Sequence, residues 1–536
     1  MSTLSVENDL FIIGAGSEGQ ALTAELAGSK AANLWQMAML GLKVPPAFVI
    51  STRLCKPMNA GDSRAEELLR RMLAKGIGEL ERATGRVFGD ARHPLLVSVR
   101  SGAARSMPGM LDTILNTGLT PRTVHGLIRV TGNPRLAWDS YRRFVQAFTE
   151  VTGAKGSDAF AAKLGAAIKA EGVASEGELD PEALERLTTA FLDEAAGLLD
   201  EPIPSNPFQQ LETAAKAVYR SWESERAREY RRLYGLQGLA GTAVTVQAMV
   251  FGNGGGRSGA GVAFTRNPAT GAKGLYIDFL FDAQGEDVVS GRRMLTPPES
   301  FKERLPEAAN VLEEGAARLE SHFRDMQDIE FTVEDGTLYF LQTRPAKRTP
   351  RAALRVLIDL VQEGAIDREE GTRRAAEIDF EAAAITRFEG EAAALAAGTP
   401  ASAGVASGRA VFESARAVEL SARTAGPIIL IRPDTSTADV AGFAVSAGIL
   451  TASGGRTAHA AVVARQLGKA CVVGCAGLAV DVTARQAVIS GRTIKEGDWL
   501  SIDGESGEVF LGERRIVTAR PEAEIAEIES WRKRGR

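Results

Sequence analysis

The stretch Gly454-Gly455-Arg456-Thr457-Ala458-His459-Ala460-Ala461-Val462-Val463-Ala464-Arg465 places a histidine just after two glycines at the start of a predicted helix. We expect Thr457 to be the N-cap, helix formers continue from Ala458 to Leu467, and Gly468 is placed to end the helix. His459 then lies in the first turn, where free backbone N–H groups and the helix dipole favour a phosphoryl group and a neutral, nucleophilic ring. A packed histidine at a helix start fits these residues equally well.

Strands and helices alternate around this helix. Apolar strands are expected at residues 428–431 and 449–451, with a helix opened by residues 436–439 between them. Another strand follows the histidine helix at residues 470–473, and residues 499–511 close the region with a hairpin. This order predicts an α/β domain.

The composition of the whole chain limits its class. A chain of 536 residues with 44% hydrophobic and 24% charged residues is expected to form several globular domains. Its net charge of −5, without basic runs interleaved with aromatics, argues against a nucleic-acid partner. Cys55, Cys471 and Cys475 are too few for a disulfide framework, and we find neither an export signal nor an apolar run long enough for a membrane. We therefore expect a cytoplasmic protein.

The first third of the chain holds two candidate phosphate ligands. Residues 14–19 match the glycine pattern of a dinucleotide-binding turn, but no β-α-β unit follows, so we do not expect such a site. Lys30 begins a helix and could reach phosphate oxygens, although these residues alone favour a solvated lysine. Arg100 is the stronger candidate because it ends an apolar strand at residues 95–99. The small residues of the loop 105–113 would let backbone approach a triphosphate.

A second glycine-rich loop, Gly252 to Gly261, lies between two predicted strands at residues 241–250 and 262–268. Glycines allow backbone N–H groups to point at an anion, so the loop could lie over phosphates. A flexible surface hairpin is the alternative for any isolated run of glycines.

The run Asp328-Ile329-Glu330-Phe331-Thr332-Val333 alternates polar and apolar residues. Side chains alternate between the faces of a strand, so Asp328 and Glu330 should share one face while the apolar residues are buried on the other. Residues 334–336 are a turn signal, and residues 338–344 form the returning strand.

The length of this turn decides which side chains converge. A two-residue loop would pair Asp328 with Thr343 and send Gln342 to the opposite face. A three-residue loop, with Gly336 in the left-handed conformation, sets Asp328 opposite Gln342, and we expect this arrangement. Carboxylate and amide oxygens then suit magnesium, and Arg344 complements phosphate charge. A solvated hairpin edge is the alternative.

Several of these segments together resemble the pyruvate phosphate dikinase family, in the family's order. The matching segments are the regions around Lys30 and Pro45-Pro46, Ser98 to Ala103, Ser106 to Met110, Tyr141 to Phe144, Ser221-Trp222, the glycine loop, Gln284 to Val289, the carboxylate hairpin and the histidine helix. The resemblance implies an α/β and α+β multidomain fold, with an ATP-grasp-type nucleotide-binding module followed by a swivelling β/α phosphohistidine domain.

The resemblance also implies an order of domains. The nucleotide-binding module would span residues 1–346, with a helical insertion at about 135–235. A helical linker would follow at 347–397, the phosphohistidine domain at 398–513, and a charged helix and tail at 514–536.

Site residues follow from the same resemblance. The expected catalytic residues are His459, Arg100, Lys30 and Arg344. Magnesium would be bound by Asp328, Glu330 and Gln342. The residues expected to bind the nucleotide are Lys30, Arg100, Gln247, Met249, Gly254, Gly255, Gly256, Glu286, Asp287, Asp328, Glu330, Gln342 and Arg344. Around the histidine, Arg456 and Ala458 are expected to affect docking of the domain rather than its chemistry, and Thr457 matches a position that is regulated by phosphorylation in plant members.

The implied activity is phosphorylation of His459 by magnesium-ATP and inorganic phosphate, with release of AMP and pyrophosphate. The acceptor, pyruvate or another molecule, would bind to a separate subunit or barrel protein, because no β/α barrel of about 250 residues fits after residue 512. A fragment of a dikinase that performs only the ATP half-reaction is a second hypothesis. A non-catalytic phosphocarrier or nucleotide sensor is the alternative from another class. The sequence leaves the oligomeric state open.

Overall fold

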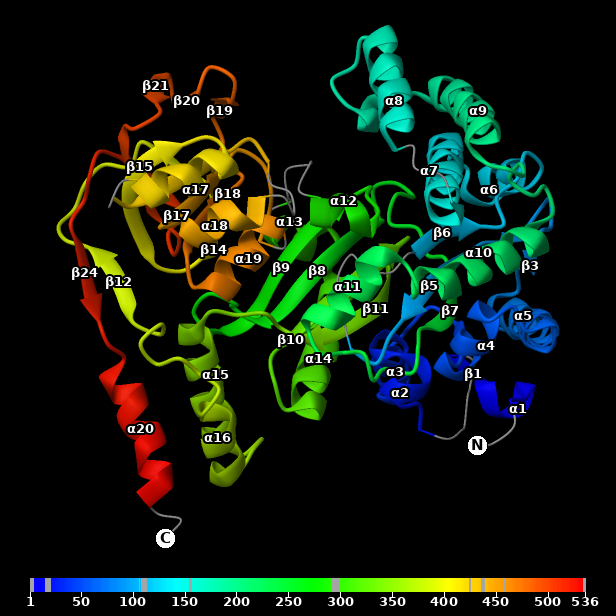
Figure 1. The fold of residues 1–536 in the computed structure, drawn as a ribbon, viewed down its shortest axis with the longest axis horizontal. Coiled ribbons are helices and arrows are strands. Elements are labelled where there is room, and N and C mark those ends of the chain that lie inside the picture. The colour runs from blue at the N-terminus through cyan, green and yellow to red at the C-terminus, as the bar shows by residue number, and fades with distance from the viewer. Residues whose placement is uncertain are drawn as a thin grey trace. The chain divides into compact units, whose positions relative to one another are not determined.

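The computed structural model of the chain describes most of its residues. Outside the described part lie residues 1–3, 15–20, 106, 108–112, 154–156, 291–295, 297, 424–425, 435–438, 457 and 534–536, and also the side chains of residues 157, 286, 289, 290, 298, 459, 466, 532 and 533. The chain forms two compact units, one from Met1–Val250 with Tyr339–Gln342 and one from Phe251–Leu338 with Thr343–Arg536 (Figure 1). The main division therefore falls near residue 250, inside the expected module of residues 1–346.

The first unit is built on a five-stranded sheet in which every neighbouring pair is antiparallel. In spatial order the strands are β1 (Leu10–Ile13), β2 (Ala47–Ile50), β7 (Ala243–Ala248), β5 (Val97–Gly102) and β6 (Thr113–Thr117). A dinucleotide-binding fold needs a parallel β-α-β unit at its glycine-rich turn. The antiparallel β1–β2 pair therefore agrees with the prediction that residues 14–19 do not form such a site; residues 15–20 themselves lie outside the described part.

Helices accompany this sheet, and the longest of them shows why they form. In α5, Leu69 and Leu80 are buried, Asp62 caps the first turn by accepting from the N–H of Arg64, and Gly85 ends the helix at φ 67°. The elements are α1 (Val6–Asp9), α2 (Ala24–Ala27), α3 (Ser29–Met39), the 3-10 helix Thr52–Leu54, α4 (Cys55–Asn59), α5 (Ser63–Thr84), α6 (Thr123–Thr131) and the short strand pair β3 (Val87–Phe88) and β4 (Pro94–Leu95).

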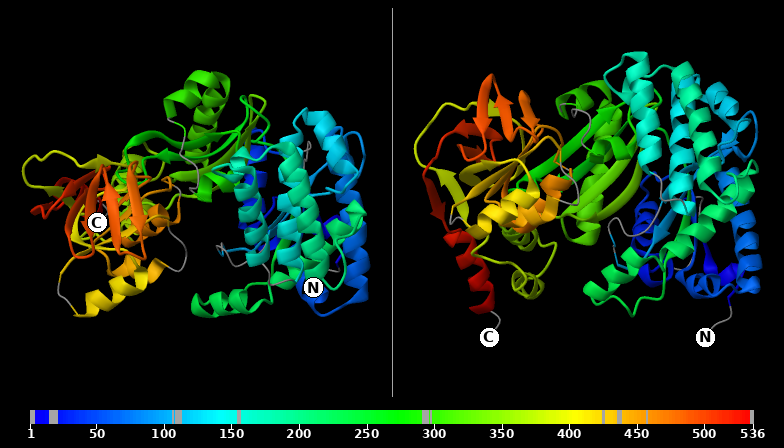
Figure 2. Two further views of the ribbon diagram at one scale, coloured as in Figure 1. Left: turned by 90° about the horizontal axis from the view of Figure 1, so that it is seen from above. Right: turned by 45° about the horizontal axis from the view of Figure 1, so that its top comes forward.

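The segment expected to be helical at about 135–235 is helical, and Figure 2 shows its helices in cyan and green. They are α7 (Pro134–Thr152), α8 (Ser157–Glu171), the 3-10 helix Glu176–Glu178, α9 (Pro181–Leu198), α10 (Pro207–Ser221) and α11 (Glu225–Leu233). Asn133 caps α7, and Asp139 is buried between Arg142 and Arg143, at 2.7 and 2.9 Å. Ion pairs thus stabilise this helical region from inside.

The second unit begins with an antiparallel four-stranded sheet in the order β11-β10-β8-β9. Its strands are β8 (Gly259–Arg266), β9 (Lys273–Phe281), β10 (Gln327–Glu334) and β11 (Thr337–Pro345), and its helices are α12 (Gly285–Ser290), α13 (Pro298–Arg304) and α14 (Pro306–Phe323). Phe279 on β9 and Phe331 on β10 stack with their rings 9° from parallel. Gly259 and Gly261 on β8 leave the room that these two rings occupy.

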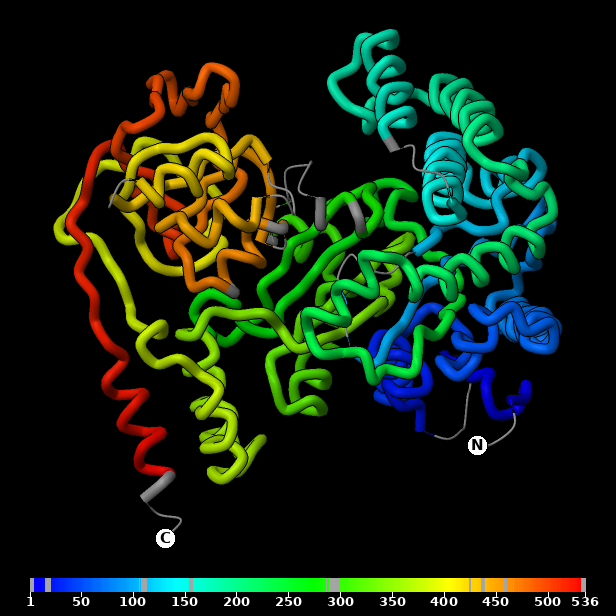
Figure 3. The backbone as a smooth tube through the Cα atoms, viewed as in Figure 1, coloured from blue at the N-terminus to red at the C-terminus, as the bar shows by residue number. Residues whose placement is uncertain are grey.

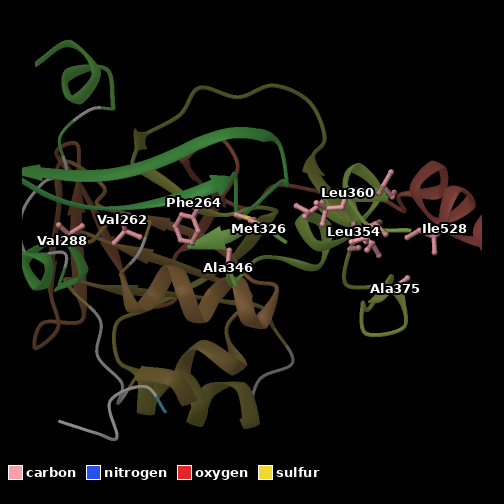
Figure 4. Packing of buried hydrophobic residues seen from close by; sticks show 14 of the residues in the cluster. Val262, Phe264, Val288, Met326, Ala346, Leu354, Leu360, Ala375 and Ile528 are labelled. Atoms are coloured by element: carbon pink, nitrogen blue, oxygen red, sulfur yellow. The ribbon is translucent and has the colours of Figure 1, made fainter. Parts of the chain in front are cut away.

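The expected helical linker is only partly helical. α15 (Pro350–Gln362) and α16 (Arg368–Ala375) are followed by β12 (Ile385–Phe388), which pairs with β24 (Ile516–Ala519), so the prediction of helix up to about residue 395 is wrong. The final helix α20 (Glu522–Lys533) is not merely a charged tail. Its Ile528 and Trp531 are buried in one cluster with Leu354 and Leu360 of α15 (Figure 4). Local composition hid these pairings because the partners are more than 100 residues apart.

The rest of the second unit is an eight-stranded sheet with helices, whose backbone Figure 3 traces. In spatial order its strands are β13 (Ala396–Ala397), β23 (Glu508–Leu511), β22 (Trp499–Asp503), β15 (Val405–Val411), β16 (Ile428–Arg432), β17 (Gly448–Thr451), β18 (Ala470–Val473) and β14 (Thr399–Ser402). The helices are α17 (Ser414–Arg423), α18 (Val440–Val445) and α19 (His459–Leu467), and β19 (Leu478–Asp481), β20 (Gln486–Ile489) and β21 (Arg492–Lys495) form a small separate sheet.

This sheet confirms the predicted alternation. The pairs β15–β16, β16–β17 and β17–β18 are parallel, and β22 and β23 form the expected closing hairpin. The helix expected to open at residues 436–439 begins at Val440, with residues 435–438 outside the described part. Over the described residues, no helix is both long and apolar enough to cross a membrane.

Candidate functional site

Within the first unit, the N-terminus of α3 packs against the end of β5, and these two elements carry Lys30 and Arg100. Gly28 has φ 79°, and a Cβ at this position would collide with the backbone of Gly102. Only glycine therefore allows this close approach. Lys30 is exposed in the first turn of α3, and Arg100 is half-buried on β5. We call these two residues the first half-site.

The expected nucleotide ligands Gln247 and Met249 belong to the same sheet. Gln247 is 2% exposed, and its Nε2 donates to the carbonyl oxygen of Pro45 at 3.2 Å. The N–H of Met249 donates to the carbonyl oxygen of Leu96 at 2.9 Å. The Gln247 amide thus holds the chain before β2, and contact of either residue with a nucleotide stays a prediction.

The second unit holds the glycine loop between β7 and β8. The N–H of Gly255 donates to Oδ1 of Asp282 at 3.3 Å, and Arg304 donates to the carbonyl oxygen of Gly256 at 3.0 Å. Gly254 and Gly256 are exposed. The loop is therefore anchored from one side while its glycine backbone remains accessible, as a phosphate-covering loop requires.

Glu286 and Asp287 follow β9, and the contact of Asp287 is a local structural one. Oδ2 of Asp287 accepts a hydrogen bond of 2.9 Å from the N–H of Gln284 and so stabilises the start of α12. The side chain of Glu286 lies outside the described residues. Binding of a nucleotide or a metal by Glu286 and Asp287 stays a prediction.

The carboxylate hairpin gathers three of the expected residues. Nε of Arg344 donates to Oδ2 of Asp328 at 2.8 Å, and its Nη2 lies 3.8 Å from Oε1 of Glu330. Asp328 is 5% exposed, whereas the Arg344 side chain is half exposed. We call Asp328, Glu330 and Arg344 the second half-site.

The turn of this hairpin is formed by Asp335 and Gly336, which have φ angles of 44° and 77°. Because β10 ends at Glu334 and β11 begins at Thr337, the loop has two residues, so the prediction of a three-residue loop is wrong, although the left-handed conformation of Gly336 is confirmed. At the open end of the hairpin, Oγ1 of Thr343 donates to Oε1 of Gln327 at 2.9 Å, so these two side chains meet on one face. Gln342 is 9% exposed and is counted with the first unit, so its position beside the carboxylates stays a prediction.

The two oxygens of Asp328 have different surroundings. Oδ2 accepts from Arg344, whereas Oδ1 is buried and has no hydrogen-bond partner among the described residues. Burial raises the pKa of the Asp328 carboxyl above its ordinary value, although Arg344 opposes this shift. A buried oxygen without a partner needs an explanation, and a hard divalent cation supplies one.

These oxygen donors fit a magnesium ion better than they fit a metal that is enclosed by protein ligands alone. The described part of the chain has no group of three His, Cys, Asp or Glu side chains placed to hold a metal. Magnesium usually binds one or two carboxylates together with substrate phosphates and water. Asp328 and Glu330 offer that number of carboxylates on one strand.

The sheet places these carboxylates in register with two residues of β9. In an antiparallel pair, directly opposite residues present their side chains on the same face. Two rows across the sheet follow from the register: Tyr276–Phe264–Asp328 and Asp278–Val262–Glu330. All six side chains therefore share one face, and the outer strands of each row lie about 10 Å apart.

The histidine helix differs in its start from the prediction. α19 begins at His459 and its N-cap is Ala458, which offers no side-chain oxygen, while Thr457 lies outside the described residues. The expectation of Thr457 as N-cap is therefore wrong. Gly468 ends the helix at φ 63°, as predicted. Among the described residues, no side-chain cap bond engages the first-turn N–H groups of α19, which suits an anion there.

Two arginines bring this helix to the face of the sheet that bears the carboxylates. Arg456 lies over the Tyr276 ring at 3.8 Å from its centroid, and its Nη1 is 3.8 Å from Oδ1 of Asp278. Arg465, 1% exposed, lies 5.5 Å from the centroid of Phe264 and donates from Nη2 to the carbonyl oxygen of Arg456 at 2.7 Å. The sequence did not predict these contacts, because no local pattern relates an arginine near a helix to a tyrosine on a distant strand.

Two family models match the chain, one for a nucleotide-binding domain and one for a mobile domain of phosphoenolpyruvate-utilising enzymes. Residues 24–306 and 295–364 match the family "Pyruvate phosphate dikinase, AMP/ATP-binding domain". Residues 425–507, which include His459, match "PEP-utilising enzyme, mobile domain".

Individual relatives agree with these matches. The chain is 42% identical to pyruvate, phosphate dikinase 2 of Zea mays over 527 residues, which cover 97% of the chain and 60% of that protein. It is 42% identical to pyruvate, phosphate dikinase of Clostridium symbiosum, covering 96% of the chain and 59% of that protein. For pyruvate, phosphate dikinase of Rhizobium meliloti (strain 1021) the identity is 41%, with 97% and 60% covered. The chain therefore belongs to the pyruvate phosphate dikinase family, and it spans about 60% of the length of these relatives.

Proposed function

We propose that the chain phosphorylates its own His459 with ATP, in a dikinase-type reaction that converts ATP and inorganic phosphate into AMP, pyrophosphate and phosphohistidine. The observation that carries this proposal is Oδ1 of Asp328, which is buried and has no partner among the described residues, on the sheet face that receives the histidine helix. A ligand for a nucleotide-bound cation and a nucleophile on one face are what a phosphoryl transfer to histidine requires.

The reaction balances in two transfers. A neutral imidazole nitrogen of His459 attacks the β-phosphorus of ATP, and the bond to the α-phosphoryl oxygen breaks, which releases AMP. An oxygen of inorganic phosphate then attacks the terminal phosphorus and leaves as pyrophosphate. His459 keeps the former β-phosphoryl group. The N–H groups of the first turn of α19 favour the neutral ring and then the anionic product.

The chain's side chains would position and stabilise charge rather than react covalently. Arg344 in the second half-site, and Lys30 and Arg100 in the first, complement the charge of the transferred group. Asp328, Glu330 and, as expected from the sequence, Gln342 would hold magnesium. When bound, magnesium neutralises charge on the phosphates.

The acceptor is the least constrained part of the proposal. The relatives are pyruvate, phosphate dikinases by name, so pyruvate is the first candidate, with another small acceptor as second. A separate subunit or barrel protein as the binder of the acceptor stays part of the proposal. The free and buried cysteines Cys55, Cys471 and Cys475 support a reducing compartment, the cytoplasm.

The test uses the full chain with magnesium and ATP labelled at either the β- or the γ-phosphate, with and without inorganic phosphate. We expect acid-labile β-label on the protein, γ-label in pyrophosphate only when phosphate is present, and loss of protein label in His459→Ala. A wild-type chain that forms neither AMP nor labelled protein under either condition would refute catalysis. If such a chain still bound ATP, it would be a nucleotide sensor; if it only accepted phosphoryl groups from another protein, it would be a phosphocarrier.

A further inference from the structure

We infer that Arg456 is a positioning residue that docks the histidine helix onto the carboxylate-bearing face of the sheet, and that this docking, which rests on the proposed function, sets the rate at which His459 is charged. Arg456 lies three residues before His459, and three residues of chain span at most about 10 Å. An anchor at Arg456 therefore limits where the nucleophile can be.

Both ends of Arg456 are held. Its guanidinium lies 3.8 Å from the centroid of Tyr276 and 3.8 Å from Oδ1 of Asp278, and its carbonyl oxygen accepts from Arg465 at 2.7 Å. Arg465 also donates to the carbonyl oxygen of Ala401 at 2.7 Å, on the strand β14. The main chain before the histidine is thus tied to its own domain, and the side chain of Arg456 is tied to the sheet.

The surroundings make this contact more than a surface ion pair. Asp278 is 3% exposed and the Arg456 side chain 19%, so water screens the pair little. A planar guanidinium satisfies a ring and a carboxylate at once, which the ammonium of lysine does less well.

The strand register shows where on the sheet Arg456 docks. Tyr276 is in the same cross-strand row as Asp328, and Asp278 is in the same row as Glu330. Arg456 therefore docks at one end of the two rows whose other ends carry the second half-site. The contact places the start of the helix on the face of the sheet that bears the carboxylates.

The test compares the full-length wild type with Arg456→Ala, Arg456→Lys and the control Arg423→Ala, which removes only an exposed ion pair on α17. The first measurement is the single-turnover rate of protein labelling from β-labelled ATP over a range of ATP concentrations. We expect the rate at saturating ATP to fall roughly tenfold in Arg456→Ala, with partial rescue in Arg456→Lys, while the half-saturating ATP concentration is unchanged. Tyr276→Leu should cause a similar fall, and the double variant little more.

The second measurement needs no catalysis. Hydroxyl-radical oxidation of Tyr276, followed by mass spectrometry, reports whether the ring is covered. Oxidation should be faster in Arg456→Ala than in wild type and in Arg423→Ala. Unchanged oxidation would refute docking even if labelling slows, and unchanged labelling with faster oxidation would refute the positioning role.

These two measurements separate the inference from the proposed function. If the wild type is not labelled, the proposed activity fails, whereas Tyr276 oxidation still decides whether Arg456 docks the helix. If the wild type is labelled and Arg456→Ala matches it in both measurements, only the inference fails.

Discussion

Nε of Arg344 donates a hydrogen bond of 2.8 Å to Oδ2 of Asp328, and the other oxygen of this carboxylate is buried without a partner among the described residues. The arginine fixes the orientation of the carboxylate, so Oδ1 is held ready for a cation. In the proposed site, Asp328 is the magnesium ligand and Arg344 orients it, on a strand whose register with β8 also fixes Glu330.

The first prediction concerns this carboxylate. Asp328→Asn should lower AMP formation from magnesium-ATP by roughly 100-fold or more, because the amide removes the anionic oxygen that the cation needs. The same change at Asp193, exposed on α9, is the matched control and should leave the rate unchanged. Removing magnesium with a chelator should reduce the wild type to the level of the variant. Equal AMP formation by Asp328→Asn and wild type would exclude Asp328 as a ligand.

The second prediction concerns the approach of α3 to β5. Gly28→Ala should weaken binding of a non-hydrolysable ATP analogue by about tenfold or more, because a Cβ there collides with Gly102 and displaces Lys30. Gly41→Ala is the control, since Gly41 has a similar φ of 74° but open space around its Cβ position. Gly41→Ala should destabilise the fold by about 1 kcal/mol through backbone strain and leave the affinity for the ATP analogue unchanged. Calorimetric titration with the ATP analogue measures the affinity of each variant. Equal affinities of the two variants would contradict the prediction.

The third prediction concerns the buried charge cluster that joins β8 to α14 and α15. Arg266, 2% exposed, lies 2.7 Å from Glu320, 2.9 Å from Asp359 and 3.3 Å from Glu363. Arg266→Met should reduce the free energy of unfolding of the second unit by about 3–5 kcal/mol, because buried Asp359 then keeps only the exposed Arg355 as a cationic partner.

Arg318→Met is the control for this cluster. Arg318 makes only an exposed pair with Glu314 at 3.8 Å, worth at most about 1 kcal/mol. Urea unfolding measures the difference, and similar midpoints for the two variants would show that the cluster contributes little.

The fourth prediction concerns acid stability of the helical region. Burial opposes ionisation of Asp139, but Arg142 and Arg143 outweigh it and lower the pKa of its carboxyl below the ordinary value. A lowered pKa contributes stability that is fully present above about pH 4, the unfolded value, and is lost as pH falls through the native value. Asp139→Asn should therefore destabilise the helices more at pH 7 than at pH 3. Thermal melts followed by circular dichroism at both pH values measure this, and a deficit independent of pH would contradict it.

The sequence by itself determined the local elements of the second half-site and of the histidine domain. Strict alternation in residues 328–333 identified a strand with Asp328 and Glu330 on one face, because strand side chains alternate. Helix formers ending at Gly468 identified α19, since glycine readily adopts the left-handed conformation that ends a helix. The β-α-β order around His459 was likewise readable, because each parallel strand is an apolar run between helices.

The tertiary structure decided which distant residues these elements contact. The pairing of β12 with β24 and the burial of Trp531 depend on partners far away in the sequence. Register across three strands, which no local pattern encodes, put Tyr276 and Asp328 in one row and so gave Arg456 its place on the sheet. Local residues fix backbone conformation within a few positions, whereas burial and cross-strand neighbours are set by packing of the whole unit.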